Sequence, residues 1–382
     1  MRSKLICALL LVAAPFALLA APPSQQFGIG DPPNSVTLHF GAVEFDKLAL
    51  EDAAAAKLNT PYRYGIGRKV DSVAIEGEKS SGGEWTTLAD GRELWRQRVV
   101  SDGAKSLDFG FTRYRLPHGA QLWISSGPKG AAEGPYTDAH NQRSGQLWTA
   151  MVPGESALIE LVVPAQMREF VELKLGYVNH GYRAPFEREA DKSGSCNVDT
   201  ICPQGDPWRD QIRSVGAYSF SAGSGQTPGS FSCTGTLMNR TGGDRDPLFL
   251  TANHCLSSAA QAATVVVYWN YASPTCRSVN STANGVQVAV PSGLPSNSGT
   301  TLVSTFVTTD MTLLRLTSAP PAAANPYWAG WDRRDLAPAS ATSIHHASGH
   351  EKRISFEMQP LSISGYLECA AGARSRRSQP AQ

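Results

Sequence analysis

The sequence CTGTLMNRTGGDRDPLFLTANHC, residues 233–255, predicts two short β-strands and places a histidine where the second strand ends. The first strand begins at Cys233, a turn rich in Gly and Asp follows, and an apolar run leads to His254 and Cys255. A disulfide between the two cysteines would tie the strands together and hold the histidine on a short loop. A histidine fixed in this way is well placed to act as a base, while a metal ligand or a structural histidine remain the alternatives.

A carboxylate that would orient this histidine occurs further along the chain. Asp310 lies in VTTDMTLLRL, residues 307–316, just before an apolar strand. A carboxylate at the mouth of a buried strand can accept a hydrogen bond from Nδ1–H of an imidazole and hold the tautomer that works as a base. The alternative is that Asp310 caps a turn.

The N-terminus has the pattern of a secretory signal peptide. Arg2 and Lys4 precede an apolar run and then small residues, so residues 1–20 are predicted to be removed after Ala20. A transmembrane anchor is the rival interpretation, but the run is short. Export would bring the cysteines that remain into an oxidising compartment, where they are expected to form disulfides. None of them has the CxxC spacing of a zinc site. These cysteines are Cys196, Cys202, Cys233, Cys255, Cys276 and Cys369.

Length and patterning divide the 382 residues into two β-rich parts. Residues 28–185 alternate apolar and polar residues in short runs between Gly and Pro breaks, which predicts an all-β sandwich with one helix at 45–58. A polar linker at 187–210 separates this part from a second series of short strands. The net charge of +1 favours neither nucleic acid nor an anionic membrane as a partner. Four tryptophans have the spacing of core residues rather than of a sugar-binding face: Trp85, Trp95, Trp123 and Trp148.

Several motifs that follow one another from residue 193 carry a resemblance to a known family. They include SGSCNVDTIC, SVGAYS, CTGTLMN, FLTANHC, VVVYWNY, DMTLLRL, YWAGWDRRD, IHH and EKRISFE. In this order they resemble the lysyl endopeptidases, which are secreted bacterial serine proteases of the chymotrypsin-like fold. The upstream part, with GQLWTAMVPGESALIEL and YVNHGYR, is similar to the β-rich propeptide of that family.

The resemblance implies an all-β chain: a sandwich-like propeptide domain at 21–192, a first chymotrypsin-like barrel at 193–318 and a partial second barrel at 319–368. It implies that His254 and Asp310 are the catalytic histidine and aspartate. It also implies the disulfides Cys233–Cys255 and Cys202–Cys276. Lys192, which precedes Ser193, is the expected cleavage site of a protease that cuts after lysine, and an exposed lysine in a polar linker is the alternative. Substrates would be proteins or peptides, with no cofactor or metal, and the monomeric chain would dock its propeptide on its own protease domain.

No serine nucleophile is found in the expected place. Chymotrypsin-like proteases carry it after the aspartate, in a Gly-rich turn such as GDSGG or GSSGS. After Asp310 this sequence has HHASGHE (345–351) and PLSISGYLE (360–368), and neither fits. The resemblance stops near Glu368, and residues 369–382 form a short basic tail. The chain is therefore expected to be inactive as written.

Two alternatives belong to other functional classes. The first is that the chain is a non-catalytic secreted protein that binds or inhibits. The second is that it is a metal-dependent hydrolase. The metal site would use His254, His345, His346 and His350, but these lack the HExxH spacing.

Overall fold

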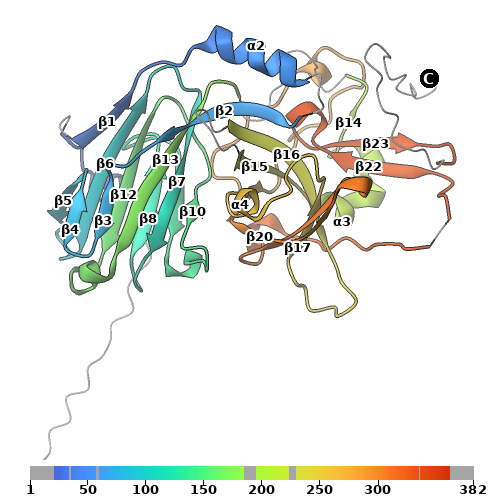
Figure 1. Cartoon of the computed structure of the whole chain (residues 1–382). Coiled ribbons are helices and arrows are strands. Elements are labelled where there is room, and N and C mark those ends of the chain that lie inside the picture. Colours follow the sequence, from blue (N-terminus) through green and yellow to red (C-terminus); the bar gives the residue numbers. More distant parts are fainter. Residues whose placement is uncertain are drawn as a thin grey trace, which may run out of the picture.

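The structure is a computed structural model that describes residues 21–33, 36–56, 60–184, 195–222, 229–334 and 336–361. Figure 1 shows the chain as two β-rich halves, the N-terminal half (residues 21–184) on the left and the C-terminal half (residues 195–361) on the right. The longest helix described, α2 (Phe45–Ala56), falls where the sequence predicts one. The all-β class is confirmed.

The N-terminal half is a sandwich of two sheets. One sheet has the order β1 (Thr37–Phe40), β6 (Glu93–Ser101), β12 (Ser156–Val163), β8 (Gln121–Ser125), β9 (Ala132–Tyr136), with β5 (Glu84–Thr87) on β6. The other contains β10 (Leu147–Trp148), β7 (Ser106–Arg115), β13 (Glu172–Gly181) and β2 (Tyr62–Lys69), with β11 (Val152–Pro153), β3 (Ala74–Glu76) and β4 (Lys79–Ser81) at its sides. A short helix, α1 (Pro23–Phe27), precedes them.

The strands of the sandwich alternate between its core and its outer faces. In β7, Leu107, Phe109 and Phe111 enter the core, where they join Trp95 of β6 and Ile159 of β12. Successive residues of a strand point to opposite faces, so the residues between them face away from this core.

The four tryptophans of the N-terminal half are packed rather than displayed. Trp95, Trp123 and Trp148 are buried, and Trp85 packs against the sandwich core. They do not form an exposed aromatic surface of the kind that binds sugars, so the core interpretation is confirmed.

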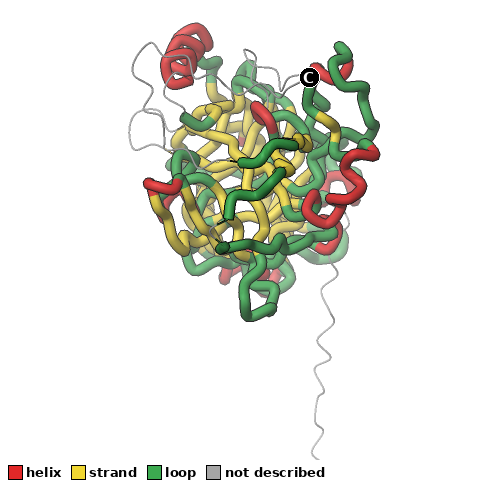
Figure 2. Tube along the Cα trace, turned by 90° about the vertical axis from the view of Figure 1, so that its right-hand side faces the viewer, coloured by secondary structure: helices red, strands yellow, loops and turns green. Residues whose placement is uncertain are grey.

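The C-terminal half is built mainly from seven strands of one twisted sheet path. In order they are β20 (Thr300–Phe306), β21 (Met311–Leu316), β17 (Leu248–Thr251), β16 (Gly229–Met238), β15 (Val215–Ala222), β18 (Val266–Tyr268) and β19 (Ser296–Ser298). No pairing among the described residues joins β19 to β20, so a closed barrel stays a prediction. The path encloses Tyr218, Phe249, Val267, Trp269 and Leu314, and Figure 2 shows strands filling the interior with loops and short helices outside.

The two halves share a sheet. Strand β2 of the N-terminal half pairs antiparallel with β16, with Ile66 opposite Gly229 and Tyr62 opposite Ser232. Strand β17 uses the same side of β16 further along, where Thr236 lies opposite Leu250. The N-terminal half therefore reaches the strand that carries Cys233.

A smaller sheet and a disulfide anchor the beginning of the C-terminal half. Strand β14 (Val198–Asp199) pairs with β23 (Arg353–Glu357), which pairs with β22 (Ala341–His345). The disulfide Cys202–Cys276 follows directly, with its Cα atoms 4.8 Å apart, and this predicted bridge is confirmed. Two short helices, α3 (Arg209–Ile212) and α4 (Ala259–Ala262), complete the half.

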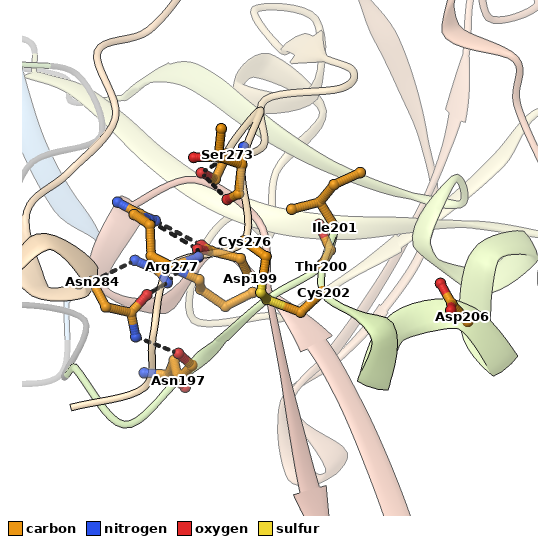
Figure 3. The surroundings of a disulfide bond; sticks show 12 residues. Asn197, Asp199, Thr200, Ile201, Cys202, Asp206, Ser273, Cys276, Arg277 and Asn284 are labelled. Carbon is orange, nitrogen blue, oxygen red and sulfur yellow. Dashed lines mark hydrogen bonds and ion pairs between the residues drawn. A yellow bond between two sulfur atoms is a disulfide. The ribbon is translucent and has the colours of Figure 1, made fainter. Parts of the chain in front are cut away.

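Beside this disulfide lies a buried group of ion pairs. Arg277 turns toward Asp199 in Figure 3, and its Nε donates to Asp199 Oδ2 at 2.9 Å. Arg353 Nη1 lies 2.7 Å from Asp199 Oδ1, and Arg353 Nη2 lies 2.6 Å from Glu351 Oε1. The side chains of Asp199, Glu351 and Arg353 have no exposed surface.

Candidate active site

His254 lies on a loop that the surrounding strands hold in place. Strand β17 ends at Thr251. The loop that follows is hydrogen-bonded to the hairpin of β20 and β21, both before and after the histidine. Asn253 Nδ2 donates to Thr305 Oγ1 at 2.7 Å, and Thr312 Oγ1 donates to the carbonyl of Leu256 at 2.8 Å. The histidine is thereby positioned by residues of β20 and β21.

The disulfide Cys233–Cys255 fixes the same loop from β16. Its Cα atoms are 6.4 Å apart, which lies within the usual range for a bridge, so the predicted pairing is confirmed. Cys255 is buried, whereas the side chain of His254 is 53% exposed. The backbone of His254 is therefore held by the bridge next to it, while its imidazole ring is partly exposed to solvent.

Removal of this bridge is expected to loosen the loop measurably. The double variant Cys233→Ala/Cys255→Ala should lose about 3 kcal/mol of local stability, because the bridge closes a loop of 22 residues in the chain-entropy estimate. Hydrogen exchange of the β16 and β17 amides measures the loss. Cys196→Ala, at an exposed free thiol, is the control and should leave exchange unchanged. Equal hydrogen exchange in the double variant and in the wild type would contradict a stabilising role for the bridge.

Asp310 contacts His254 through both carboxylate oxygens. Oδ2 lies 2.6 Å from His254 Nδ1, and Oδ1 accepts a hydrogen bond from the backbone N–H of His254 at 2.8 Å. The carbonyl of Asp310 also accepts from Asn253 N at 3.1 Å. The predicted contact between the two side chains is confirmed. A carboxylate in this position holds the proton on Nδ1 and leaves Nε2 as the basic atom.

The backbone of Asp310 adopts a conformation that the sequence did not indicate. Its φ and ψ are 50° and 44°, in the left-handed region, at the end of the turn Val307–Thr309. Asp is one of the few residues other than Gly that enters this region readily. The reversal brings the carboxylate back toward His254 before β21 begins at Met311.

A pocket of about 340 Å³ lies beside His254 and is lined by both halves of the chain. The C-terminal half contributes Thr234, the Cys233–Cys255 bridge and His346, and the N-terminal half contributes residues 60–62. The family resemblance implied a docked propeptide, but the residues of the N-terminal half that line this pocket were not predicted, because strand pairing between distant segments leaves no local sequence signal.

The other histidines of the predicted metal site make contacts within the C-terminal half. His346 is buried and stacks on Tyr271, its Nδ1 lies 2.9 Å from the carbonyl of His350, and burial lowers its pKa to about 3. His345 Nε2 contacts Ser355 Oγ at 3.1 Å.

Among the described residues, no set of side chains close enough to bind one metal ion contains both His254 and one of these histidines. The set that is present consists of Cys233, His254 and Cys255, and its two sulfurs are joined in a disulfide. It therefore offers no thiolate to a metal.

Other predicted features lie outside the described residues. These are the signal peptide at 1–20, the cleavage site Lys192–Ser193, and Cys369 with the rest of the tail. Cys196 is described, and its thiol is free and exposed. Among the helices that the structure describes, none has the length and apolar character needed to span a membrane.

Comparison with known proteins places both halves in one family. Residues 39–180 match the family model for the lysyl endopeptidase N-terminal domain, and residues 190–377 match that for the lysyl endopeptidase C-terminal domain. The second match runs on past Glu368, where the sequence motifs stop.

A curated relative matches over most of the chain as well. The lysyl endopeptidase of Pseudomonas aeruginosa is 28% identical over 354 residues, which cover 88% of this chain and 74% of the relative. Two domain models matched in order, together with this alignment, show that the chain belongs to the lysyl endopeptidase family of serine endopeptidases.

Proposed function

We propose that this chain is the exported precursor of an endopeptidase that cleaves proteins or peptides after lysine, with His254 as the general base and Asp310 as the residue that orients it. The observation that carries the proposal is the 2.6 Å contact between Asp310 Oδ2 and His254 Nδ1 on a loop held by a disulfide. A base held in this tautomer has Nε2 available to take the proton of a serine hydroxyl as it attacks a peptide carbonyl.

The N-terminal half acts as a propeptide that docks on the protease half. Two observations support this role: β2 pairs with β16, and residues 60–62 line the pocket beside His254. A strand held there covers one side of the site and restricts the approach of a substrate. Cleavage at Lys192–Ser193 would cut the covalent link between the halves. The leader sequence and the two disulfides support export.

A second candidate is a secreted protein that binds or inhibits without catalysis. The observation in its favour is the sequence after Asp310, which up to residue 382 contains no serine in a GDSGG or GSSGS type of turn. Such a turn supplies both the nucleophile and the backbone N–H groups of the oxyanion hole. The histidine and its carboxylate can activate a nucleophile but cannot replace one.

A polypeptide of residues 21–382 is therefore expected to show no lysine-specific proteolysis. We expect its hydrolysis of a lysyl amide to equal that of its His254→Ala variant, because neither protein combines a base with a nucleophile in a suitable turn. The assay follows oxidative folding and release of the amine. Turnover that disappears in His254→Ala would contradict this expectation and would show that another serine is recruited.

A further inference from the structure

Asp108 places a carboxyl group in the contact between the two halves. It lies in β7 between Leu107 and Phe109, which enter the sandwich core, so its side chain leaves on the face toward the C-terminal half. Asp108 Oδ1 accepts from Asn179 Nδ2 at 2.5 Å, and Asn179 also donates to Ser221 Oγ of the C-terminal half at 3.3 Å. Tyr64 donates to Asp108 Oδ2 at 3.2 Å.

Glu133 places a second carboxyl group in the same contact. Its Oε1 accepts a hydrogen bond from the backbone N–H of Gly293, in the C-terminal half, at 3.0 Å. The side chain lines a cavity of about 380 Å³ whose walls come from both halves, with Met151 on one side and Tyr268 and Leu294 on the other. Glu133 is 9% exposed and Asp108 is 5% exposed.

Neither carboxyl group has a positive partner among the described residues. Asp108 and Glu133 form no ion pair with a described Lys, Arg or His; Lys105 lines the cavity of Glu133 without pairing with it. The other titratable groups that face them are Tyr64, Tyr136 and Tyr268. Burial raises the pKa of each of these tyrosines well above 10, so they stay neutral at physiological pH.

Burial acts on both carboxyl groups in the same direction. It raises the pKa of Asp108 to about 7, although hydrogen bonds from Asn179 and Tyr64 oppose the rise. It also raises the pKa of Glu133 to about 7, against the hydrogen bond from Gly293. The charged forms are disfavoured because each would be desolvated with no neighbouring positive charge to compensate.

We propose that Asp108 and Glu133 make the contact between the two halves sensitive to pH, so that the N-terminal half is held tightly in acidic surroundings and is loosened as both carboxyl groups ionise. The contact itself does not depend on catalysis. Only its consequence, exposure of the His254 pocket when β2 leaves β16, rests on the proposed function.

The direction follows from proton linkage. When the halves separate, water reaches both carboxyl groups and each pKa returns toward its ordinary value of about 4. The contact therefore binds more protons than the separated halves do between pH of about 4 and 7. Its stabilisation is fully present below this interval and is lost as the pH rises to about 7, by roughly tenfold per pH unit for each carboxyl group.

Hydrogen exchange on the intact chain tests the proposal. The readout is the protection of amides in residues 229–232 of β16, which pair with β2, corrected for the intrinsic pH dependence of exchange. Between pH 5 and 7 the opening of this pairing is expected to rise by up to about a hundredfold per pH unit if both carboxyl groups respond fully. The Asp108→Asn/Glu133→Gln variant should lose this dependence, and Glu133→Gln alone should roughly halve its logarithmic slope.

Two comparisons keep the result interpretable. Glu155→Gln changes an exposed carboxylate of the same half that accepts a hydrogen bond from the backbone N–H of Gly103, within that half, and it should keep the full pH dependence. Protection of the β12 amides shows whether each variant retains a folded sandwich. A wild-type chain whose pairing does not respond to pH, or a double variant that responds as the wild type does, would overturn the proposal. This readout does not involve peptidase activity, which is expected to be absent from this chain, so failure of the pH response and failure of the proposed function are observed separately.

Discussion

A chimera of residues 21–361 followed by the corresponding C-terminal segment of the Pseudomonas aeruginosa lysyl endopeptidase is expected to hydrolyse lysyl amides, and Asp310→Asn is expected to lower its kcat about 10⁴-fold. The amide of Asn fills the same space but offers Nδ1 of His254 a donor as readily as an acceptor. The imidazole is then free to carry its proton on Nε2, where it cannot accept the proton of a serine. The 2.6 Å contact of Asp310 Oδ2 is the interaction that this change removes.

The matched control is Asp244→Asn in the same chimera. Asp244 is an exposed residue of the turn between β16 and β17, where it pairs with Arg240, and its replacement should leave kcat unchanged. A rate within tenfold of the unmodified chimera after Asp310→Asn would show that this carboxylate does not orient the base. Absence of activity in the chimera, with the β16 and β17 amides still protected, would count against the peptidase assignment itself.

The pair of His254 and Asp310 could be predicted because His254 follows a short apolar strand and Asp310 precedes one, each inside a motif of its own. The apolar pattern around each residue and the order of the family motifs were sufficient to predict that the two side chains meet. The reversed backbone at Asp310 could not be predicted in the same way, because Asp tolerates the left-handed region without requiring it. The role was therefore visible in the sequence, whereas the geometry that fulfils it was not.

The family resemblance implied that the N-terminal half docks on the protease half, but the strands and side chains that make this contact could not be predicted, for a different reason. Strand β2 has no residue that marks it as a partner of β16, and its pairing depends on segments far apart in the chain. Asp108 illustrates the consequence. A polar residue alternating with Leu107 and Phe109 is typical of a strand with one face in water, and only the fold shows that the C-terminal half covers that face.

The buried ion pairs of the C-terminal half were missed as well. Charged residues are mostly found at the surface, so Asp199 in a polar segment and Arg353 in EKRISFE gave no indication of burial. In the structure both side chains are fully buried and face each other at 2.7 Å. Burial raises the pKa of Asp199, but the hydrogen bonds from Arg277 and the positive charges of Arg353 and Arg277 together lower it by more, so the group is charged at neutral pH.

Loss of one member of this network is expected to be among the most destabilising single changes in the chain. Arg353→Met keeps much of the side-chain volume but removes the group that bridges Asp199 and Glu351 and also donates to Asn284 Oδ1 at 2.6 Å. Removing one partner of a buried ion pair typically costs about 3–5 kcal/mol, because the remaining charge stays desolvated. Arg277 still contacts both carboxylates, so the loss should fall near the lower end, about 3 kcal/mol.

The loss should appear in the sheet of β14, β23 and β22, because Asp199 and Arg353 lie opposite each other in its strand pairing. Hydrogen exchange of these strands measures it, and Arg334→Met, which removes an exposed partner of Asp332, should leave them unchanged. The side chain of Arg353 also donates to the backbone carbonyl of Asn284, so the change frees a loop that is bonded to residues 195–197 at the start of the C-terminal half. Unchanged protection in Arg353→Met would mean that Arg277 alone compensates both carboxylates and that Arg353 does not stabilise this sheet.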